Sequence, residues 1–397
     1  MFYLFVSLFF VLSLLSPCAE AALTPIEISE AKEVITSSEE RSNNFIKYRE
    51  VLADKYGTEL AFLFNYTQQA ILRASHDQGK SRGVGYLNLE VKQNLWSGGA
   101  VFLEVETDNG MGVDKLIPTY SQFNNNFGER IPIYIPELYL EQSLFSGKVL
   151  LVTGKIGLSD WFDANNAAES ADTQFLSSAL VNNLAIPFPS KGLGGLITFA
   201  PYEWVYLQSG VGTARATSTK TGLSDGFNSS LFINELGFSF KTKELEGNYR
   251  LIFYLNHERL ERIDGEGEKK DTLGYALSFD QEITKKVTLF LRYGCADEKI
   301  WDIKRFWSFG AQVNEPFLGR KDDYFAIGVA RSIMGNDFRS LNEDTAARRE
   351  TIYEIYYSCS LNSFVTLTPS LQLVTHPNAD KDSKAALVIG CRFLLSF

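Results

Sequence analysis

Strand-like alternation fills most of this sequence and constrains the fold more than any other feature. The segment 273–280 reads Leu-Gly-Tyr-Ala-Leu-Ser-Phe-Asp, with large apolar residues on one face and small or polar residues on the other. This pattern predicts sixteen strands, at 58–68, 82–94, 99–107, 133–145, 147–156, 193–200, 202–213, 231–241, 246–257, 270–281, 285–295, 304–314, 322–332, 350–360, 364–375 and 384–397. A small or polar second face suits the wet interior of a barrel, whereas a soluble sandwich would need that face exposed to water.

The connections between these strands alternate in length. The links that follow most even-numbered strands are tight turns, whereas five that follow odd-numbered strands are long: 108–132, 157–192, 214–230, 258–269 and 333–349. Tight periplasmic turns and long external loops are typical of an outer-membrane barrel. The turn 315–321 and the short link 76–81 depart from the pattern. The sequence therefore predicts an all-β fold, a transmembrane antiparallel up-and-down β-barrel of about 16 strands, with both ends in the periplasm.

The last predicted strand alternates up to the aromatic residue Phe397. A closing strand with a terminal Phe resembles the segment by which outer-membrane barrels are recognised for assembly. The alternative is a buried C-terminal strand of a soluble β-protein, and this segment alone does not separate the two. The fifteen other alternating segments favour the barrel, so we expect Phe397 to engage the barrel-assembly machinery.

The N-terminal region predicts export. Met1 to Pro17 is almost wholly apolar and precedes a small-x-small site at Ala19–Ala21, although the usual Lys or Arg is missing. We expect residues 1–21 to be a signal peptide and residues 58–397 to be the barrel domain. Between them, residues 22–57 are expected to form a periplasmic or lumenal helical segment, with a solvated linker helix as the alternative.

Composition narrows the function further. The net charge of −10 argues against nucleic acid as a partner, because phosphate binding needs a basic surface. The three His residues, His76, His257 and His376, lie in no constellation that would activate a nucleophile. We therefore expect no metal, no cofactor and no catalysis, with a barrel lipase or protease as the weaker alternative. The 30 Phe and 18 Tyr suit the aromatic girdles of a barrel in contact with outer-membrane lipid.

One stretch carries a family resemblance. Gly154-Lys155-Ile156-Gly157 is followed by Phe162-Asp163-Ala164-Asn165, by a Gln-Phe-Leu to Val-Asn-Asn run at 174–183, and by Ala-Ile-Pro-Phe-Pro at 185–189. This stretch resembles the carbohydrate-selective, OprB-like porins. Weaker similarity occurs at 136–142 and 372–380. Ser159 and Leu184 depart from the family pattern, and Leu184 stands where a Pro is frequent.

The resemblance implies an outer-membrane porin of a Gram-negative-type bacterium that passes mono- or oligosaccharides passively. It also implies that the third external loop, 157–192, folds into the barrel and narrows the pore. A structural or adhesive barrel plugged by its own loops is the alternative. The sequence names no particular sugar and leaves the oligomeric state open, a homo-oligomer included.

A sugar path needs hydrogen-bonding groups that replace water and aromatic faces on which sugar rings can stack. Strand phase and the loop motif give the candidates Arg73, Glu90, Lys92, Glu104, Glu106, Glu137, Glu141, Trp161, Asp163, Asn165, Asn166, Arg250 and Arg292. Several have simpler interpretations. Glu90 and Glu104 could solvate the wall or brace the loop, Trp161 could pack the loop against the barrel, and Arg292 could form a structural ion pair.

Overall fold

The computed structural model describes residues 48–126, 130–217, 219–222, 224, 228–317 and 319–397. It divides into two units, residues 1–56 and residues 57–397. In the first unit, residues 48–56 are helical. The predicted signal peptide and most of the predicted N-terminal helix lie outside the described residues. No helix in the described ranges has the length and apolar character needed to cross a membrane.

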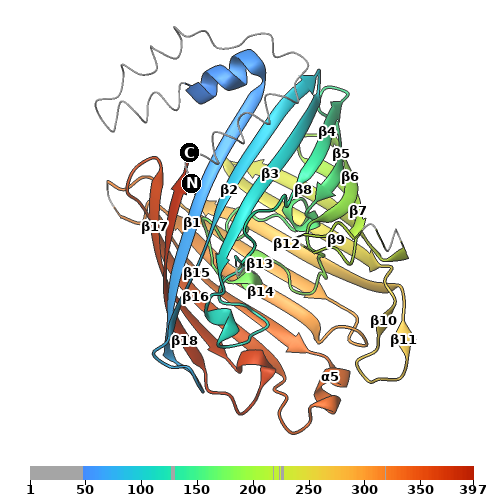
Figure 1. Ribbon diagram of the computed structural model, residues 1–397, viewed down its shortest axis with the longest axis vertical. Coiled ribbons are helices and arrows are strands. Elements are labelled where there is room, and N and C mark those ends of the chain that lie inside the picture. The colour runs from blue at the N-terminus through green and yellow to red at the C-terminus, as the bar shows by residue number, and fades with distance from the viewer. Residues whose placement is uncertain (1–47, 127–129, 218, 223, 225–227, 318) are drawn as a thin grey trace. The chain divides into compact units, whose positions relative to one another are not determined.

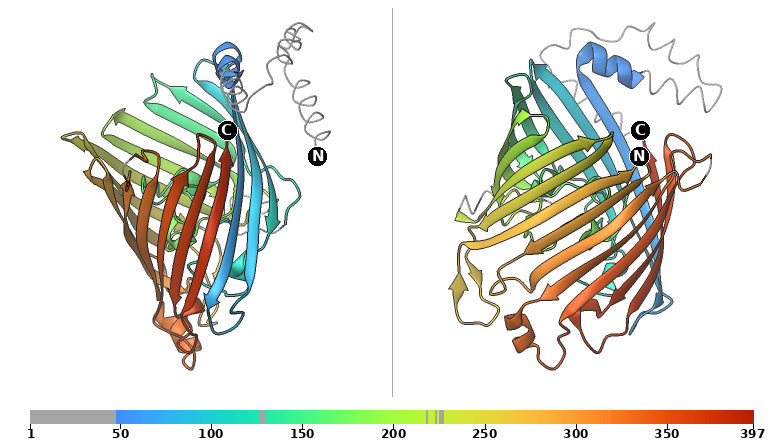
Figure 2. Two further views of the ribbon diagram at one scale, coloured as in Figure 1. Left: turned by 90° about the vertical axis from the view of Figure 1, so that its left-hand side faces the viewer. Right: turned by 180° about the vertical axis from the view of Figure 1, so that it is seen from behind.

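The described residues of the second unit form a closed barrel of sixteen antiparallel strands (Figure 1). The strands of the barrel are β1 (Thr58–Arg73), β2 (Ser81–Trp96), β3 (Gly99–Gly110), β4 (Leu138–Leu144), β5 (Val149–Ile156), β6 (Gly192–Tyr202), β7 (Val205–Thr213), β8 (Ser230–Thr242), β9 (Leu245–Asn256), β12 (Thr272–Thr284), β13 (Val287–Cys295), β14 (Ile303–Asn314), β15 (Tyr324–Met334), β16 (Arg349–Ser360), β17 (Val365–Thr375) and β18 (Ala386–Ser396). Each strand pairs with its neighbours in chain order, and β1 pairs with β18 to close the sheet, as the two side views in Figure 2 show. The predicted fold class is confirmed.

Two segments differ from the prediction. The strand predicted at 133–145 is shorter and begins only at Leu138, because Pro136 has no backbone N–H to give to a ladder. Before it, Tyr134 forms a single bridge to Glu106. The long connection from β9 to β12 contains an unpredicted two-stranded hairpin, β10 (Leu260–Glu261) and β11 (Glu268–Lys269).

The predicted alternation of faces is confirmed along the strands. On β12, Leu273 is 68% exposed on the outer surface, whereas Ala276 and Ser278 are fully buried on the inner one. The outer surface also carries stacked aromatic rings where β6 turns into β7. There Trp204 stacks on Tyr202 at 5.8 Å between ring centroids, and on two rings of β8. Such exposed apolar and aromatic groups suit contact with lipid at the edge of a membrane.

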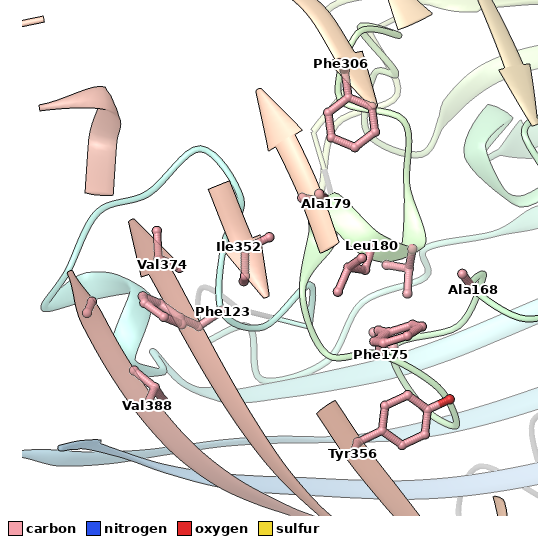
Figure 3. Packing of buried hydrophobic residues seen from close by; sticks show 14 of the residues in the cluster. Phe123, Ala168, Phe175, Ala179, Leu180, Phe306, Ile352, Tyr356, Val374 and Val388 are labelled. Atoms are coloured by element: carbon pink, nitrogen blue, oxygen red, sulfur yellow. The ribbon is translucent and has the colours of Figure 1, made fainter. Parts of the chain in front are cut away.

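Two long connections fold into the barrel. We call residues 111–137 the second loop and residues 157–191 the third loop. The shorter helical elements are η1 (Val113–Lys115) in the second loop, η2 (Leu158–Asp160) and α4 (Ser178–Val181) in the third, and α5 (Asn336–Leu341) and η4 (Pro377–Ala379) in later external connections. Phe123, Phe175 and Leu180 from these two loops are fully buried against inward side chains of β13 to β18 (Figure 3). This part of the barrel interior is therefore filled by the two loops, which pack apolar side chains against the wall.

Inward-facing glycines make room for the third loop. A Cβ atom at Gly328 would lie 2.8 Å from Leu180 Cδ2 and 2.9 Å from Phe175 Cζ. A Cβ atom at Gly210 would lie 2.8 Å from Phe162 Cε2. The wall thus lacks side chains where the largest loop side chains press against it.

Candidate pore constriction

One open space inside the barrel lies between the third loop and the wall formed by β2 and β3. It is a cavity of about 890 Å³, with further lining from the second loop. Most of its lining is polar, and the charged part is mostly acidic. The acidic lining comprises Glu90, Glu104, Glu106, Asp108, Asp160, Asp163, Glu169 and Asp172. Four of these eight carboxylates come from β2 and β3 and four from the third loop.

On the wall, Glu104 is held between two partners. It accepts a hydrogen bond from the Asn88 side chain and forms an ion pair with Lys191 Nζ at 2.7 Å. Further along β3, the Tyr134 hydroxyl of the second loop donates to both Glu106 and Asp108. The carboxylates are thus fixed in position by donors, and each keeps acceptor capacity toward the cavity.

On the loop side, Asp172 joins three parts of the chain. Its Oδ1 accepts hydrogen bonds from Asn65 Nδ2 of β1 at 2.9 Å and from Asn126 Nδ2 of the second loop at 2.7 Å. The Tyr86 hydroxyl of β2 donates to the same oxygen. This contact ties the tip of the third loop to the wall at the edge of the cavity.

Two buried guanidinium groups anchor the third loop to other strands of the barrel wall. Arg292 on β13 donates to the backbone carbonyls of Asp163, Ala168 and Leu180 at 2.5 to 2.9 Å. Arg392 on β18 donates to the carbonyls of Ala171 and Gln174 at 2.6 and 3.0 Å. Both arginines are fully buried. A loop without a ladder of its own leaves carbonyls unpaired, and these side chains satisfy them.

Buried carboxylates do the same for the backbone N–H groups of the loops. Glu354 on β16 accepts from the N–H groups of Leu176 and Ser177 at 2.7 and 3.0 Å. Glu350 on the same strand accepts from the N–H of Ser121 in the second loop at 2.7 Å. The wall therefore supplies donors and acceptors at the points where the loops have none.

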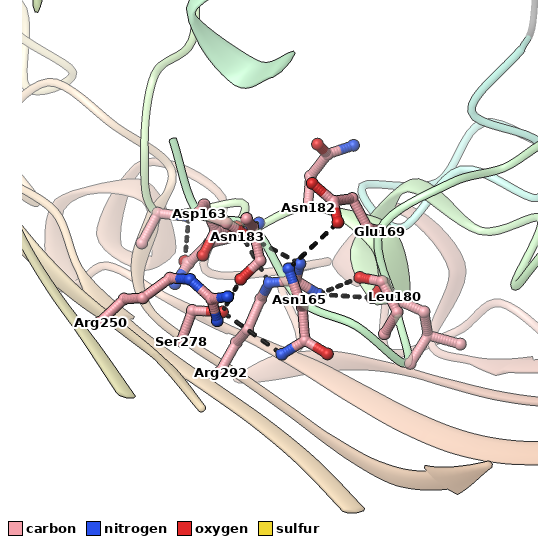
Figure 4. Close-up of polar contacts among 12 residues, drawn as sticks. Asp163, Asn165, Glu169, Leu180, Asn182, Asn183, Arg250, Ser278 and Arg292 are labelled. Carbon is pink, nitrogen blue, oxygen red and sulfur yellow. Dashed lines mark hydrogen bonds and ion pairs between the residues drawn. The ribbon is translucent and has the colours of Figure 1, made fainter. Parts of the chain in front are cut away.

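Asp163 links the cavity to this anchoring. Its Oδ2 lies 3.0 Å from Arg292 Nε and accepts from the Asn183 N–H at 2.9 Å (Figure 4). Its own backbone N–H donates to Glu235 on β8. Burial raises the pKa of the Asp163 carboxyl to about 7, although Arg292 acts in the opposite direction.

Residues 87–397 of this sequence, well over half of the chain, match the family described as carbohydrate-selective porin, OprB family. The chain belongs to the OprB family. The family and the fold are those of outer-membrane channels and not of enzymes. Among solved structures, OprB of Pseudomonas putida at high pH superimposes with a TM-score of 0.78 at 17% identity, covering 89% of this chain and 97% of that one. The channel DcaP of Acinetobacter baumannii gives 0.53 at 11% identity, over 86% and 97%.

The curated relatives of this OprB family member are matched over a smaller share of their own length than the solved structures are. Porin AaxA of Chlamydia felis is 23% identical over 294 residues, which is 72% of this chain and 61% of that protein. Porin AaxA of Chlamydia abortus is 24% identical over 222 residues, or 55% and 47%. The chain thus spans about half to three fifths of the length of these two relatives.

Of the predicted path residues in this OprB family member, four line the cavity: Glu90, Glu104, Glu106 and Asp163. Arg73 does not, because β1 has a register shift between Ile71 and Arg73. That shift pairs Arg73 with outward-facing Leu387 and leaves its side chain exposed. The alternation on which Arg73 was assigned ends at this irregularity.

Besides Arg292, four charged candidates lie inside the barrel but outside the cavity lining. Lys92 and Glu141 form an ion pair at 2.6 Å, and Arg250 pairs with Asp280 at 2.8 Å. Glu137 accepts from the backbone N–H of Gly157, where the third loop begins. These charges face inward as predicted, but they brace the wall and the loop.

The remaining candidates hold the third loop. Trp161 packs edge-on against Tyr139 at 6.0 Å between ring centroids. Asn165 is fully buried and donates to the Ser278 hydroxyl and the Phe279 carbonyl. The backbone N–H of Asn166 donates to Asp280. Arg292 is fully buried and forms an ion pair with Asp163.

Sequence reasoning missed several lining residues. Tyr86 and Asp108 share the inward phase of Glu90 and Glu106, so strand phase alone could have found them. Asp160, Asp172 and Lys191 stand in a loop, where no periodicity indicates direction. The inward path of the second loop had no signal beyond its length.

Proposed function

We propose that this chain is an outer-membrane porin for the passive diffusion of carbohydrates, in which the third loop narrows a water-filled barrel. The observation that supports this best is the cavity of about 890 Å³ between that loop and the β2–β3 wall. Its size falls within the range of roughly 300–1,000 Å³ that is typical of small-molecule sites. No sugar is assigned.

The lining has the chemistry that a sugar requires. Carboxylates and amides of the wall and loops can accept hydrogen bonds from hydroxyl groups that leave water. Tyr134 and Phe188 line the same cavity, are partly exposed, and offer aromatic faces to the apolar faces of a sugar ring. Contacts of this kind are individually weak, as passage through a channel demands. The family match supports the same substrate class.

Swelling of liposomes that contain the purified protein tests the proposal. We expect monosaccharides to enter faster than disaccharides. Ser190→Trp places a large ring in the cavity lining and should slow disaccharides more than monosaccharides. Ser340→Trp on the exposed helix α5 is the matched control and should change neither rate.

A heat-dependent shift in gel mobility would show in the same preparation that the barrel is folded. A folded barrel that passes ions but no sugar would overturn the carbohydrate assignment. A folded barrel that passes neither would favour the alternative, a structural or adhesive barrel closed by its own loops.

A further inference from the structure

The charged lining of the cavity is strongly unbalanced. Eight carboxylates line it, and among the described residues Lys191 is the one basic side chain that does so. A neutral solute would be served equally well by hydroxyl or amide groups. The density of negative charge is therefore a feature that sugar passage leaves unexplained.

The arginines inside the barrel balance little of this charge, since Asp163 is the one lining carboxylate that pairs with an arginine among the described residues. Arg292 and Arg392 are fully buried and directed at loop carbonyls, and Arg250 is paired with Asp280. Glu90, Glu106 and Glu169 form no ion pair with any residue that the structure describes, and the same holds for Asp108 and Asp172. Five of the eight lining carboxylates thus have no cationic partner among the described residues.

Asp163 gives a second, independent indication of a missing partner. The residue is only 4% exposed, lines the cavity, and uses Oδ2 for Arg292 and Asn183. Its other oxygen, Oδ1, is buried and has no hydrogen-bond partner in the described part of the chain. An unsatisfied buried carboxylate oxygen at a wet wall is an acceptor ready for a donor from a passing solute.

Lys191 shows where a cation fits. Its Nζ lies 2.7 Å from Glu104 on the wall and 3.6 Å from Asp160 on the third loop, so it bridges the two sides of the cavity. Its side chain is 30% exposed and lines the cavity. Lys191 directly precedes Gly192, the first residue of β6, so the backbone from which its side chain extends is attached to the sheet.

We propose that the path past the β2–β3 wall selects cations over anions, both alkali ions and small ammonium ions, and that Lys191 is a tethered counterion which competes with them for Glu104 and Asp160. Rings of carboxylates select cations in other channels because they attract cations and repel anions at short range. The inference requires that the cavity conducts. It does not require that sugars pass.

The reversal potential of a planar bilayer in a KCl gradient tests the inference on the full-length protein. At about 0.1 M salt we expect a reversal potential whose sign indicates selectivity for K⁺ over Cl⁻. Near 1 M salt the reversal potential should be smaller, because the screening length falls to about 3 Å. Replacement of K⁺ by tetramethylammonium should keep the sign. A chloride-selective or unselective potential in 0.1 M salt would overturn the inference, even if sugars pass.

Variants test the role of Lys191. Lys191→Met removes the tethered ammonium and should raise the ratio of K⁺ to Cl⁻ permeability several-fold, whereas the exposed Lys381→Met should leave it unchanged. Glu90→Gln, at a carboxylate that forms no hydrogen bond or ion pair with any described residue, should lower the ratio and serves if Lys191→Met does not fold. An unchanged ratio in folded Lys191→Met would remove the counterion role, and an unchanged ratio in both folded variants would overturn the inference.

Discussion

Arg292 Nε on β13 lies 3.0 Å from Asp163 Oδ2 in the third loop, and neither side chain is more than 3% exposed. The same guanidinium group donates to three loop carbonyls. Arg292 alone therefore binds the first part of the third loop, at Asp163, and its helical part, at Leu180. A charge placed so deeply is tolerated only when its partners are all present.

Arg292→Met should destabilise the barrel by about 3–5 kcal/mol, because it leaves Asp163 buried without its partner. We expect a lower midpoint in the heat-dependent gel shift, and larger, noisier single-channel currents as the third loop loosens. The double variant Arg292→Met/Asp163→Asn should recover part of the loss. If the double variant is as unstable as the sum of the single ones, the pairing does not carry the effect.

Glu354→Gln should cost about 1–3 kcal/mol. The amide keeps one acceptor for the N–H groups of Leu176 and Ser177 but gives up the other. Urea unfolding in detergent, followed by loss of sheet signal, measures the difference. Glu343→Gln, at an exposed position, is the control and should change the midpoint little. Equal midpoints for the two variants would contradict the anchoring role of Glu354.

Asp114 in the second loop should make stability depend on pH. Burial raises its pKa to about 7, against backbone hydrogen bonds such as that from the Phe123 N–H. Since the folded-state pKa lies above the unfolded one, the folded protein binds the proton more tightly. This contribution to stability is present in full below the unfolded pKa of about 3.9 and is lost as the pH rises to about 7.

The variant Asp114→Asn should therefore be more stable than the wild type at pH 8 and similar to it at pH 4. The amide oxygen can still accept from Phe123. Thermal midpoints at the two pH values measure this, with Asp382→Asn as the control at an exposed position. A variant that loses stability equally at both values would show that Asp114 acts through its hydrogen bonds alone.

Trp204 should report on lipid. It is 48% exposed and stacks on outward aromatic rings next to a tight turn. In a variant that keeps Trp204 and has Phe at the other four Trp positions, brominated lipids should quench the fluorescence strongly. A variant that keeps only Trp161, which packs inside the barrel, should be quenched weakly. The reverse order would contradict the assignment of inner and outer faces.

Strand phase predicted the barrel well because residues that face the interior alternate with residues that face outward along each strand. Leu273 and Ala276, for example, lie on opposite faces of β12. It does not show which part of the inner face stays wet. Arg250 and Arg292 face inward as their phase requires, yet one is paired on the wall and the other is covered by the third loop. The direction in which a side chain points depends on its own strand. Whether a loop then covers that side chain depends on residues more than a hundred positions away in the chain.

Irregular segments set the other limit. Arg73 lies beyond a bulge that no alternation reveals, and Lys191 belongs to a loop whose path depends on wall side chains such as Glu354. The motif 174–183 did indicate the third loop, but as a resemblance and not as geometry. The contacts of that loop could be found only once the strands were placed.

Arg392 belongs to the last strand, and Asn65 to the first, and both bind the third loop at Ala171 and Asp172. These two strands also pair with each other to close the sheet. A chain in which β1 and β18 are not yet paired therefore lacks part of the support for its third loop, and a loop left outside the barrel leaves Arg392 and Asn65 without these partners. Closure of the sheet and placement of the third loop therefore depend on each other.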